Sequence, residues 1–466
     1  MVSLIFSFDT EDFVTPESDD ALLGLARILT QHGLRGSFAL VGDKVRALLA
    51  RGRRDVIDAC REHDIQYHSN NHMFWPQTSL ALSALNWDDG VDLVVRTERH
   101  GLELVEEVMG RRPVAWARPD GNQAVREMYG LRLLGLRAMA ACSYTFPSGA
   151  PVWLVDQLLL PYNFAFERYL KPDVPAATLT ADLLALAARI DDLDVPLVSF
   201  CHPTMLATDT FYDMHNVKVR GVVPPKAEWR PPPFVGPAEL RRRLAVFAGL
   251  VEFVGSRRDM EVITISDYLA RHEEGLCWLS AAEVTALAQA IRRDFSYQEH
   301  SGGYLSAADV AGVLSHGLTH WREHHRLPDQ TPVRRIVGPP EPALALAEAR
   351  SATANELATA CQQIESEIEA RWRLPSAIAV GQPAAAPVPP ATYLMAMADA
   401  VLRLAAGEPD AAIELAPQPA LPRCKDELLA KVQVGAYVLP QDFNLGAIPT
   451  YTHLQSWSLR PAVEVR

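Results

Sequence analysis

Short apolar runs alternate with longer amphipathic segments along the first 275 residues of the chain. The longer segments, such as 94–110 and 237–255, place apolar residues every three or four positions and predict helices. The short runs predict β-strands and lie at 3–8, 36–42, 113–117, 137–143, 196–201 and 260–265. This alternation is typical of an α/β domain with a parallel sheet, and six or more such units closing on themselves would form a barrel.

The pattern changes after residue 275, where helical periods dominate. They cover 280–295, 306–325, 353–372 and 391–407. We therefore predict a barrel domain over 1–275 and a mainly α-helical accessory domain over 276–466. Residues 280–325 and 353–407 have a similar helix–loop–helix layout and form a candidate internal repeat. Their apolar faces must be buried against the barrel or against a second copy of the chain, which would make a homo-oligomer.

Composition narrows the class of protein. The chain has 466 residues and a formal net charge of −13, which argues against nucleic acid or anionic lipid as partners. No apolar stretch approaches the roughly 20 residues of a membrane span, so we expect no membrane insertion. The six cysteines form no Cys-x-x-Cys pair, and the N-terminus has no basic region before its apolar run. We therefore predict a cytoplasmic protein.

Candidate metal ligands lie where two predicted strands end. Asp9, Glu11 and Asp12 end the first strand in "SFDTED", and His68 and His72 follow the short strand-like run "IQY". A His-x-x-x-His pair alone is weak evidence, because residues at this spacing share one face of a helix or tight loop with or without a metal. Two imidazoles and one carboxylate are, however, the expected ligands of a catalytic divalent metal such as Zn²⁺.

Two further polar residues follow later strands, Arg118 in "WARPDGN" and His202 in "SFCHP". Taken in order, these stretches resemble the motifs of the polysaccharide deacetylase family (NodB-like, carbohydrate esterase family 4) over residues 3–275. The resemblance includes "GLRGSFALVG" as the second strand and the His-Ser/Thr-x-x-His motif at 68–72. It implies a distorted (β/α) barrel and a metal-dependent hydrolase of carbon–nitrogen, non-peptide bonds that removes an N-acetyl or similar small acyl group from an amino sugar or glycan.

The same resemblance implies roles for single residues. Asp9 would be the general base, and His68 and His72 would bind the metal, most often Zn²⁺, with Co²⁺ also suited to the site. A carboxylate two positions after the base lies on the same side of an extended chain, so we expect Glu11 to be the acidic ligand, with Asp12 as the alternative.

The resemblance also covers the later motifs, with departures. Arg118 would hold the base ionised through a charge-assisted pair. His202 would be the general acid, and Phe200 would flank the acetyl pocket. The motif after Arg118 reads "RPDGN" instead of Arg-Pro-Pro-aromatic-Gly, and the Asp-x-x-x-Trp stretch that would orient His202 is missing. The sequence therefore leaves the partner of His202 unidentified.

Other readings stay open at this point. The altered "RPDGN" segment also suits hydrolysis of a non-sugar amide such as a cyclic ureide, and a catalytically silent carbohydrate-binding protein is a third alternative. Phe74 and Trp75 suit either a sugar-stacking platform or loop packing. The segment at 374–382, with the helix after it, faintly resembles a pseudomurein-binding repeat. We interpret the histidine stripe His316, His320 and His324 as a partly exposed helix face, and Asp209 and His215 as candidate substrate contacts.

Overall fold

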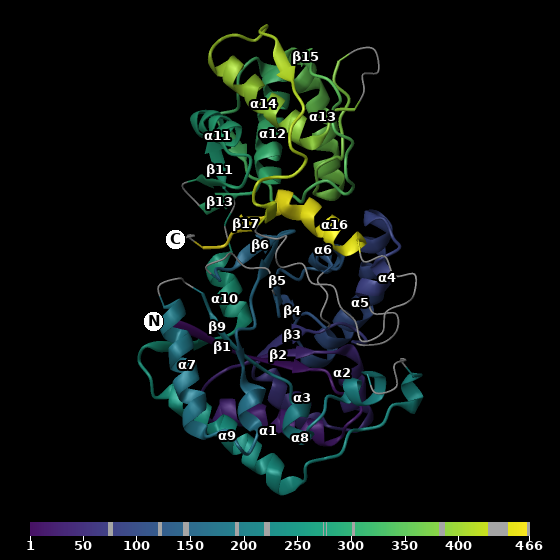
Figure 1. Cartoon of the computed structure of the whole chain (residues 1–466), viewed down its shortest axis with the longest axis vertical. Helices are drawn as coiled ribbons and strands as arrows, with labels where there is room; N and C mark the ends of the chain where they lie inside the picture. Colours follow the sequence, from purple (N-terminus) through teal and green to yellow (C-terminus); the bar gives the residue numbers. More distant parts are fainter. Residues whose placement is uncertain are drawn as a thin grey trace.

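The computed structural model consists of a barrel-like α/β part with a mainly helical part stacked on it (Figure 1). The predicted distorted (β/α) barrel followed by a helical region is confirmed. The part of the chain that the structure describes comprises residues 1–72, 78–119, 124–142, 149–191, 195–218, 224–273, 275, 277–300, 303–381, 387–426 and 446–463.

The described residues form one eleven-stranded sheet in the order β17-β6-β7-β5-β4-β3-β2-β1-β9-β8, with β10 also paired to β1. The strands are β1 (Val2–Thr10), β2 (Ser37–Leu40), β3 (Asp64–Tyr67), β4 (Ala115–Ala117), β5 (Ala138–Ala140), β6 (Val152–Leu154), β7 (Gln157–Leu159), β8 (Phe164–Ala165), β9 (Leu197–Cys201), β10 (Met260–Ile263) and β17 (Arg460–Pro461). The pairs from β7 to β8 along this order are all parallel.

Strand β1 is the point at which the barrel is distorted. Its first half, residues 2–5, pairs with β10, and its second half, residues 7–10, pairs with β2. Two strands therefore share one edge of β1 while β9 occupies the other. Leu4, Ile5 and Phe6 are almost fully buried, as expected for a parallel strand that is covered on both faces.

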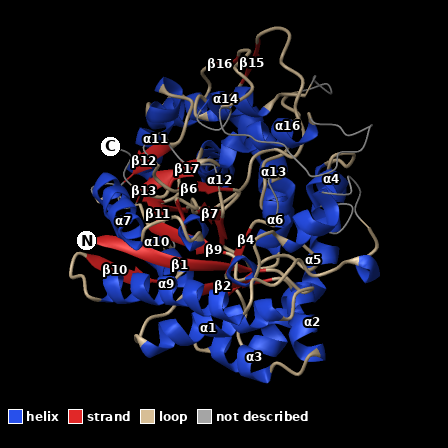
Figure 2. Ribbon diagram, turned by 60° about the horizontal axis from the view of Figure 1, so that its bottom comes forward, coloured by secondary structure: helices blue, strands red, loops and turns tan. Residues whose placement is uncertain are grey.

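Helices surround this sheet, and Figure 2 shows α1, α2, α3 and α9 along one side of it. Local sequence explains several helix ends, since Asn86 caps the start of α5 and Gly110 ends it in the left-handed conformation. The barrel helices are α1 (Glu17–Gln31), α2 (Gly42–Ala50), α3 (Arg54–Arg61), α4 (Thr78–Leu82), α5 (Trp87–Met109), α6 (Val125–Leu133), α7 (Ala176–Ile190), α8 (Thr204–Ala207), α9 (Pro237–Gly255) and α10 (Ile265–His272). Among the helices in the described ranges, none is long and apolar enough to cross a membrane.

The helical part has its own hydrophobic core. It contains α11 (Ala281–Arg293), α12 (Ala307–His324), α13 (Ala354–Arg371) and α14 (Pro390–Ala405), with a hairpin of β12 (Gln298–His300) and β13 (Gly303–Leu305) between the first two. Each helix pair lies between two strands that pair antiparallel: β11 (Trp278–Ser280) with β14 (Gln330–Pro332), and β15 (Arg350–Ala352) with β16 (Ile413–Leu415). Both units therefore share a strand–helix–helix–strand order.

The last described segment joins the two parts. Helix α16 (Ala447–Leu454) and a short 3₁₀ turn at Gln455–Ser458 lead into β17, which pairs antiparallel with β6 of the barrel sheet. Trp457 is buried in the helical core, and Leu459 is buried in the barrel core. The range predicted as the accessory domain thus also contributes an edge strand to the barrel sheet.

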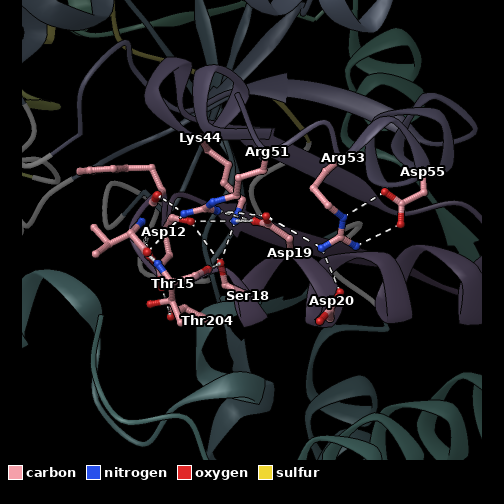
Figure 3. Close-up of polar contacts among 12 residues, drawn as sticks. Asp12, Thr15, Ser18, Asp19, Asp20, Lys44, Arg51, Arg53, Asp55 and Thr204 are labelled. Atoms are coloured by element: carbon pink, nitrogen blue, oxygen red, sulfur yellow. Dashed lines mark hydrogen bonds and ion pairs between the residues drawn. The ribbon is translucent and has the colours of Figure 1, made fainter. Parts of the chain in front are cut away.

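A buried ion pair fixes the segment that follows β1 (Figure 3). Lys44 on α2 is 1% exposed, and its ammonium donates to the Asp12 carbonyl at 2.7 Å, the Ser18 hydroxyl at 2.7 Å and the Asp19 carboxylate at 2.6 Å. Arg51 pairs with the second oxygen of Asp19 at 3.0 Å. Because Lys44 and Asp19 are both buried, loss of either charge would leave the other without its nearest partner and disturb the loop after β1.

We expect Lys44→Met to lower the free energy of unfolding by about 3 kcal/mol, because it removes the nearest cationic partner of the buried Asp19 carboxylate and leaves only the more distant Arg51, at 3.0 Å, and Arg53, at 4.0 Å. Urea titration followed by circular dichroism measures this loss. The control is Arg35→Met, which removes an exposed pair to Asp267 and should cost less than about 1 kcal/mol. Equal losses in the two variants would contradict the structural role of Lys44.

Candidate metal centre

The predicted site residues lie at the carboxyl ends of different strands. Asp9 is the penultimate residue of β1, and Glu11 comes just after that strand. His68, Arg118 and His202 directly follow β3, β4 and β9. Because these strands are parallel, their carboxyl ends meet at one edge of the sheet.

The Glu11 carboxylate lies between two imidazoles. Its Oε2 is 2.6 Å from His72 Nε2 and 3.2 Å from His68 Nε2. One ligand atom from each of these residues lies within 4.8 Å of the others, and within the described part of the chain this is the group that could hold a metal ion. The side chains of Glu11, His68 and His72 are each 4% exposed or less, so the cluster is buried.

Neighbouring groups orient both imidazoles. His68 Nδ1 donates to the Ala117 carbonyl at 2.8 Å, which leaves Nε2 as the ring atom that faces Glu11. His72 Nδ1 lies 3.2 Å from the Tyr212 hydroxyl. His72 also has a left-handed backbone (φ 52°), and its amide donates to Ser69 Oγ at 2.9 Å. This hydrogen bond helps to hold His72 in a conformation that places its Nε2 beside Glu11.

The charges of this cluster depend on one another. Burial would raise the pKa of Glu11, but the His72 charge and hydrogen bonds from both imidazoles hold it well below its usual range. Burial would lower the pKa of His72, but Glu11 raises it. Burial and the Glu11 charge together raise the pKa of nearby Asp213 to about 6. Glu11 is therefore the ionised carboxylate of the cluster.

Glu11 and Asp12, the two candidates for the acidic metal ligand, have different hydrogen-bond partners. One oxygen of Asp12 accepts the amides of Val14 at 2.8 Å and Thr15 at 2.9 Å, and the other accepts the Thr204 hydroxyl at 2.6 Å. One Asp12 oxygen thus binds the turn before α1, and the other binds the start of α8. The geometry favours Glu11 over Asp12 as the acidic ligand.

Asp9 lies beside this cluster and is held by a tyrosine. The Tyr162 hydroxyl donates to Asp9 Oδ1 at 2.6 Å, and the Tyr162 ring stacks on Phe200 with centroids 4.6 Å apart. The other oxygen, Oδ2, is 3.6 Å from His202 Nε2. The sequence analysis did not identify Tyr162, which follows the short strand β7 and belongs to no recognised motif. The pairing of Arg118 with Asp9 stays a prediction.

His202 has the carboxylate partner that the sequence left unidentified. Its Nδ1 and its backbone amide both hydrogen bond to Glu167 Oε1, the amide at 2.6 Å. Burial would lower the pKa of His202, but the charge and hydrogen bond of Glu167 outweigh it and raise the pKa to about 10. Glu167 lies in a 3₁₀ turn, Phe166–Leu170, that follows β8, and the pairing of β8 with β9 places this turn beside His202.

Among the described residues, several others singled out in the sequence do not join this cluster. His316, His320 and His324 lie on α12 of the helical part, and the Asp209 carboxylate pairs with Arg243 at 2.5 Å. Phe74, Trp75 and residues 120–122 lie outside the described residues.

No family model and no curated protein sequence matches the chain. Similar solved structures include a polysaccharide deacetylase from Mycobacterium smegmatis, with 17% identity, a TM-score of 0.38 and 58% of this chain and 89% of that chain covered. A family 4 carbohydrate esterase from Streptomyces lividans, in complex with acetate, has 13% identity, a TM-score of 0.29 and coverages of 55% and 90%.

A third similar structure is a 4-alpha-glucanotransferase from Thermococcus litoralis, with 11% identity, a TM-score of 0.40 and coverages of 63% of this chain and 46% of that chain. These values are too low to assign a family or an activity. The resemblance of residues 374–382 to pseudomurein-binding repeats has no support in these comparisons.

We expect Glu11→Gln to abolish stoichiometric binding of added Zn²⁺, because the amide removes the negative charge that lies between His68 and His72. Metal analysis after dialysis measures this. The matched control is Asp12→Asn, one residue further on, which should retain the metal while losing stability through its weakened turn. Metal lost from Asp12→Asn and kept by Glu11→Gln would reverse the assignment.

Proposed function

We propose that the chain is a metal-dependent hydrolase that removes an N-acetyl, or similar small acyl, group from an amino sugar or glycan. The observation that carries the proposal is a set of three groups at one sheet edge: the Glu11, His68 and His72 cluster, the Asp9 carboxylate, and the His202 imidazole. Hydrolysis of a stable amide needs these three functions, namely an electrophile, a base and an acid.

The donor set fits a divalent metal. Glu11, His68 and His72 offer one oxygen and two nitrogens, a ligand set suited to Zn²⁺ and also open to other metals such as Co²⁺. When bound there, the metal would polarise the acyl carbonyl and lower the pKa of water. The Ala117 carbonyl supports this role because it fixes His68 with Nε2 toward the cluster.

Asp9 is placed to act as the general base. The Tyr162 hydroxyl holds Oδ1, so Oδ2 is the oxygen that can accept a proton from the attacking water. The Tyr162 and Phe200 rings stack beside this carboxylate, and their apolar faces suit the methyl end of an acetyl group.

His202 is placed to act as the general acid. Glu167 binds Nδ1, so the proton for the leaving nitrogen comes from Nε2, which lies on the Asp9 side of the ring. Because Glu167 raises the pKa of His202 to about 10, the imidazole is protonated at neutral pH. This arrangement supports protonation of a poor leaving group, which an amine nitrogen is.

The proposed compartment is the cytoplasm. Within the described residues no disulfide joins the cysteines, which supports a reducing environment.

The proposed reaction is tested by incubating the purified protein with a panel of N-acetylated sugars and measuring free acetate with and without a chelator. We expect acetate release that the chelator abolishes and Zn²⁺ or Co²⁺ restores. In the same assay, Asp9→Asn should retain the metal and lose about 10² to 10⁴-fold in turnover, because it removes the positioned base.

Two results would count against this assignment. Unchanged acetate release in Asp9→Asn would exclude Asp9 as the base. A wild-type protein that binds no metal and releases no acetate from any sugar would favour a carbohydrate-binding protein without catalysis.

We also predict a pH effect for Glu167→Gln. Activity that needs protonated His202 falls as pH rises through the pKa of this imidazole. Removing the Glu167 charge lowers that pKa, so the alkaline limb of the pH–rate profile should move to lower pH by about 1 to 3 units. The acid limb should stay in place. An unchanged alkaline limb would show that His202 is not the acid or that Glu167 does not control it.

A further inference from the structure

A cavity lies where the barrel and the helical part meet, and its lining residues do not include the metal cluster. It has a volume of about 350 Å³ and is lined by residues of α5 and α6 on the barrel side and by residues 370–373 at the end of α13. This volume lies in the range of small-molecule sites. Helix α5 also contacts the loop that carries His68 and His72, because its Glu98 carboxylate accepts the Asn70 amide at 2.8 Å.

Trp372 is an unusual residue in this cavity. It occupies the position after α13 with a left-handed backbone (φ 53°), where glycine is the usual residue, and 54% of its surface is exposed. Its amide donates to the Ile368 carbonyl and its carbonyl accepts from Val337, both at 2.9 Å, so the backbone is fixed. A large aromatic side chain is thus held in an unfavourable conformation without being buried, which indicates a role at the surface.

Three charged groups that line the cavity form one ion-pair cluster. The Asp88 carboxylate pairs with Arg373 at 2.5 Å and with Arg371 at 2.8 Å. Because these three groups already pair with one another, they do not require an ionic ligand. The cavity still offers polar contacts, because Asp88 and Arg371 are each about half exposed, at 54% and 53%.

One buried donor also lines the cavity. Trp87 is 1% exposed, and its indole N–H has no hydrogen-bond partner among the described residues. Burying an N–H without a partner is unfavourable, and a bound molecule with an acceptor oxygen would relieve this cost. The hydroxyl of nearby Tyr129 is already used, because it donates to the Arg371 carbonyl at 2.6 Å.

We propose that this cavity is a saccharide subsite in which Trp372 stacks on the C–H face of a neutral sugar ring. Such a ring combines a flat apolar face with hydroxyls, which suits an exposed indole next to a paired carboxylate and guanidinium and an unused N–H donor. The inference rests on the proposed function for its substrate class. It implies that a longer glycan is held by the junction of the two parts while its acyl group lies at the metal cluster.

The test uses two variants at equivalent helix ends. Trp372→Gly removes the ring and places the preferred residue at a left-handed position. His325→Gly makes the same change at the exposed end of α12, where φ is 52°. Both are made in the full chain with His68→Ala to prevent turnover. Isothermal titration with tetramers of N-acetylglucosamine, glucose or xylose gives the Kd, and thermal unfolding gives the Tm.

We expect Trp372→Gly to weaken binding of at least one tetramer by tenfold or more while the Tm stays equal or rises. His325→Gly should leave the Kd unchanged. An unchanged Kd in Trp372→Gly, no binding of any tetramer by the parent protein, or a lowered Tm with no loss of affinity would overturn the proposal. Tetramer binding that depends on Trp372 in a wild-type protein that releases no acetate would leave the subsite standing and reject only the deacetylase.

Discussion

The site is organised around the buried negative charge of Glu11. An isolated carboxylate in this position would cost several kcal/mol, so it requires cationic or metal partners at short range. His68 and His72 place their Nε2 atoms 3.2 and 2.6 Å from the Glu11 carboxylate. A polar group next to the Nδ1 atom of each imidazole fixes the orientation of the ring. The same charge makes a second ionised carboxylate unfavourable, which contributes to the raised pKa of Asp213.

The loops that carry these ligands are fixed by the helices packed against them. Lys44 holds the segment after β1 through the Asp12 carbonyl. On the other side, the Glu98 carboxylate of α5 accepts the Asn70 amide at 2.8 Å, within the segment between the two histidines. Gly101 permits this close approach, because a Cβ there would collide with Tyr67 and Asn70. Positions in α2 and α5 that touch no ligand atom therefore determine where the ligands lie.

The two parts of the molecule are connected by polar contacts as well as by the chain. Asp88 of α5 pairs with Arg371 and Arg373 of the helical part, and the Glu341 carboxylate accepts the Trp87 amide at 3.1 Å and the Tyr451 hydroxyl. Strand β17 then adds the end of the chain to the barrel sheet. The helical part is thus held against the first turn of α5.

The sequence by itself determined the features that depend on local pattern. Short apolar runs predicted the strands β1, β4 and β9, and helical periods predicted the helices α11 to α14. The positions of Glu11, His68 and His72 at strand ends, together with the His-x-x-x-His motif, predicted that these three residues are neighbours. The tertiary structure alone decided the contacts between distant segments. Tyr162 contacts Asp9, which lies 153 positions away in the sequence, and Glu167 contacts His202, which lies 35 positions away. The strands β7 and β8 that precede them have only three and two residues and show no periodic pattern in the sequence. Such short strands form only because neighbouring strands and burial stabilise them, so their partners follow from the assembled sheet and not from the local sequence.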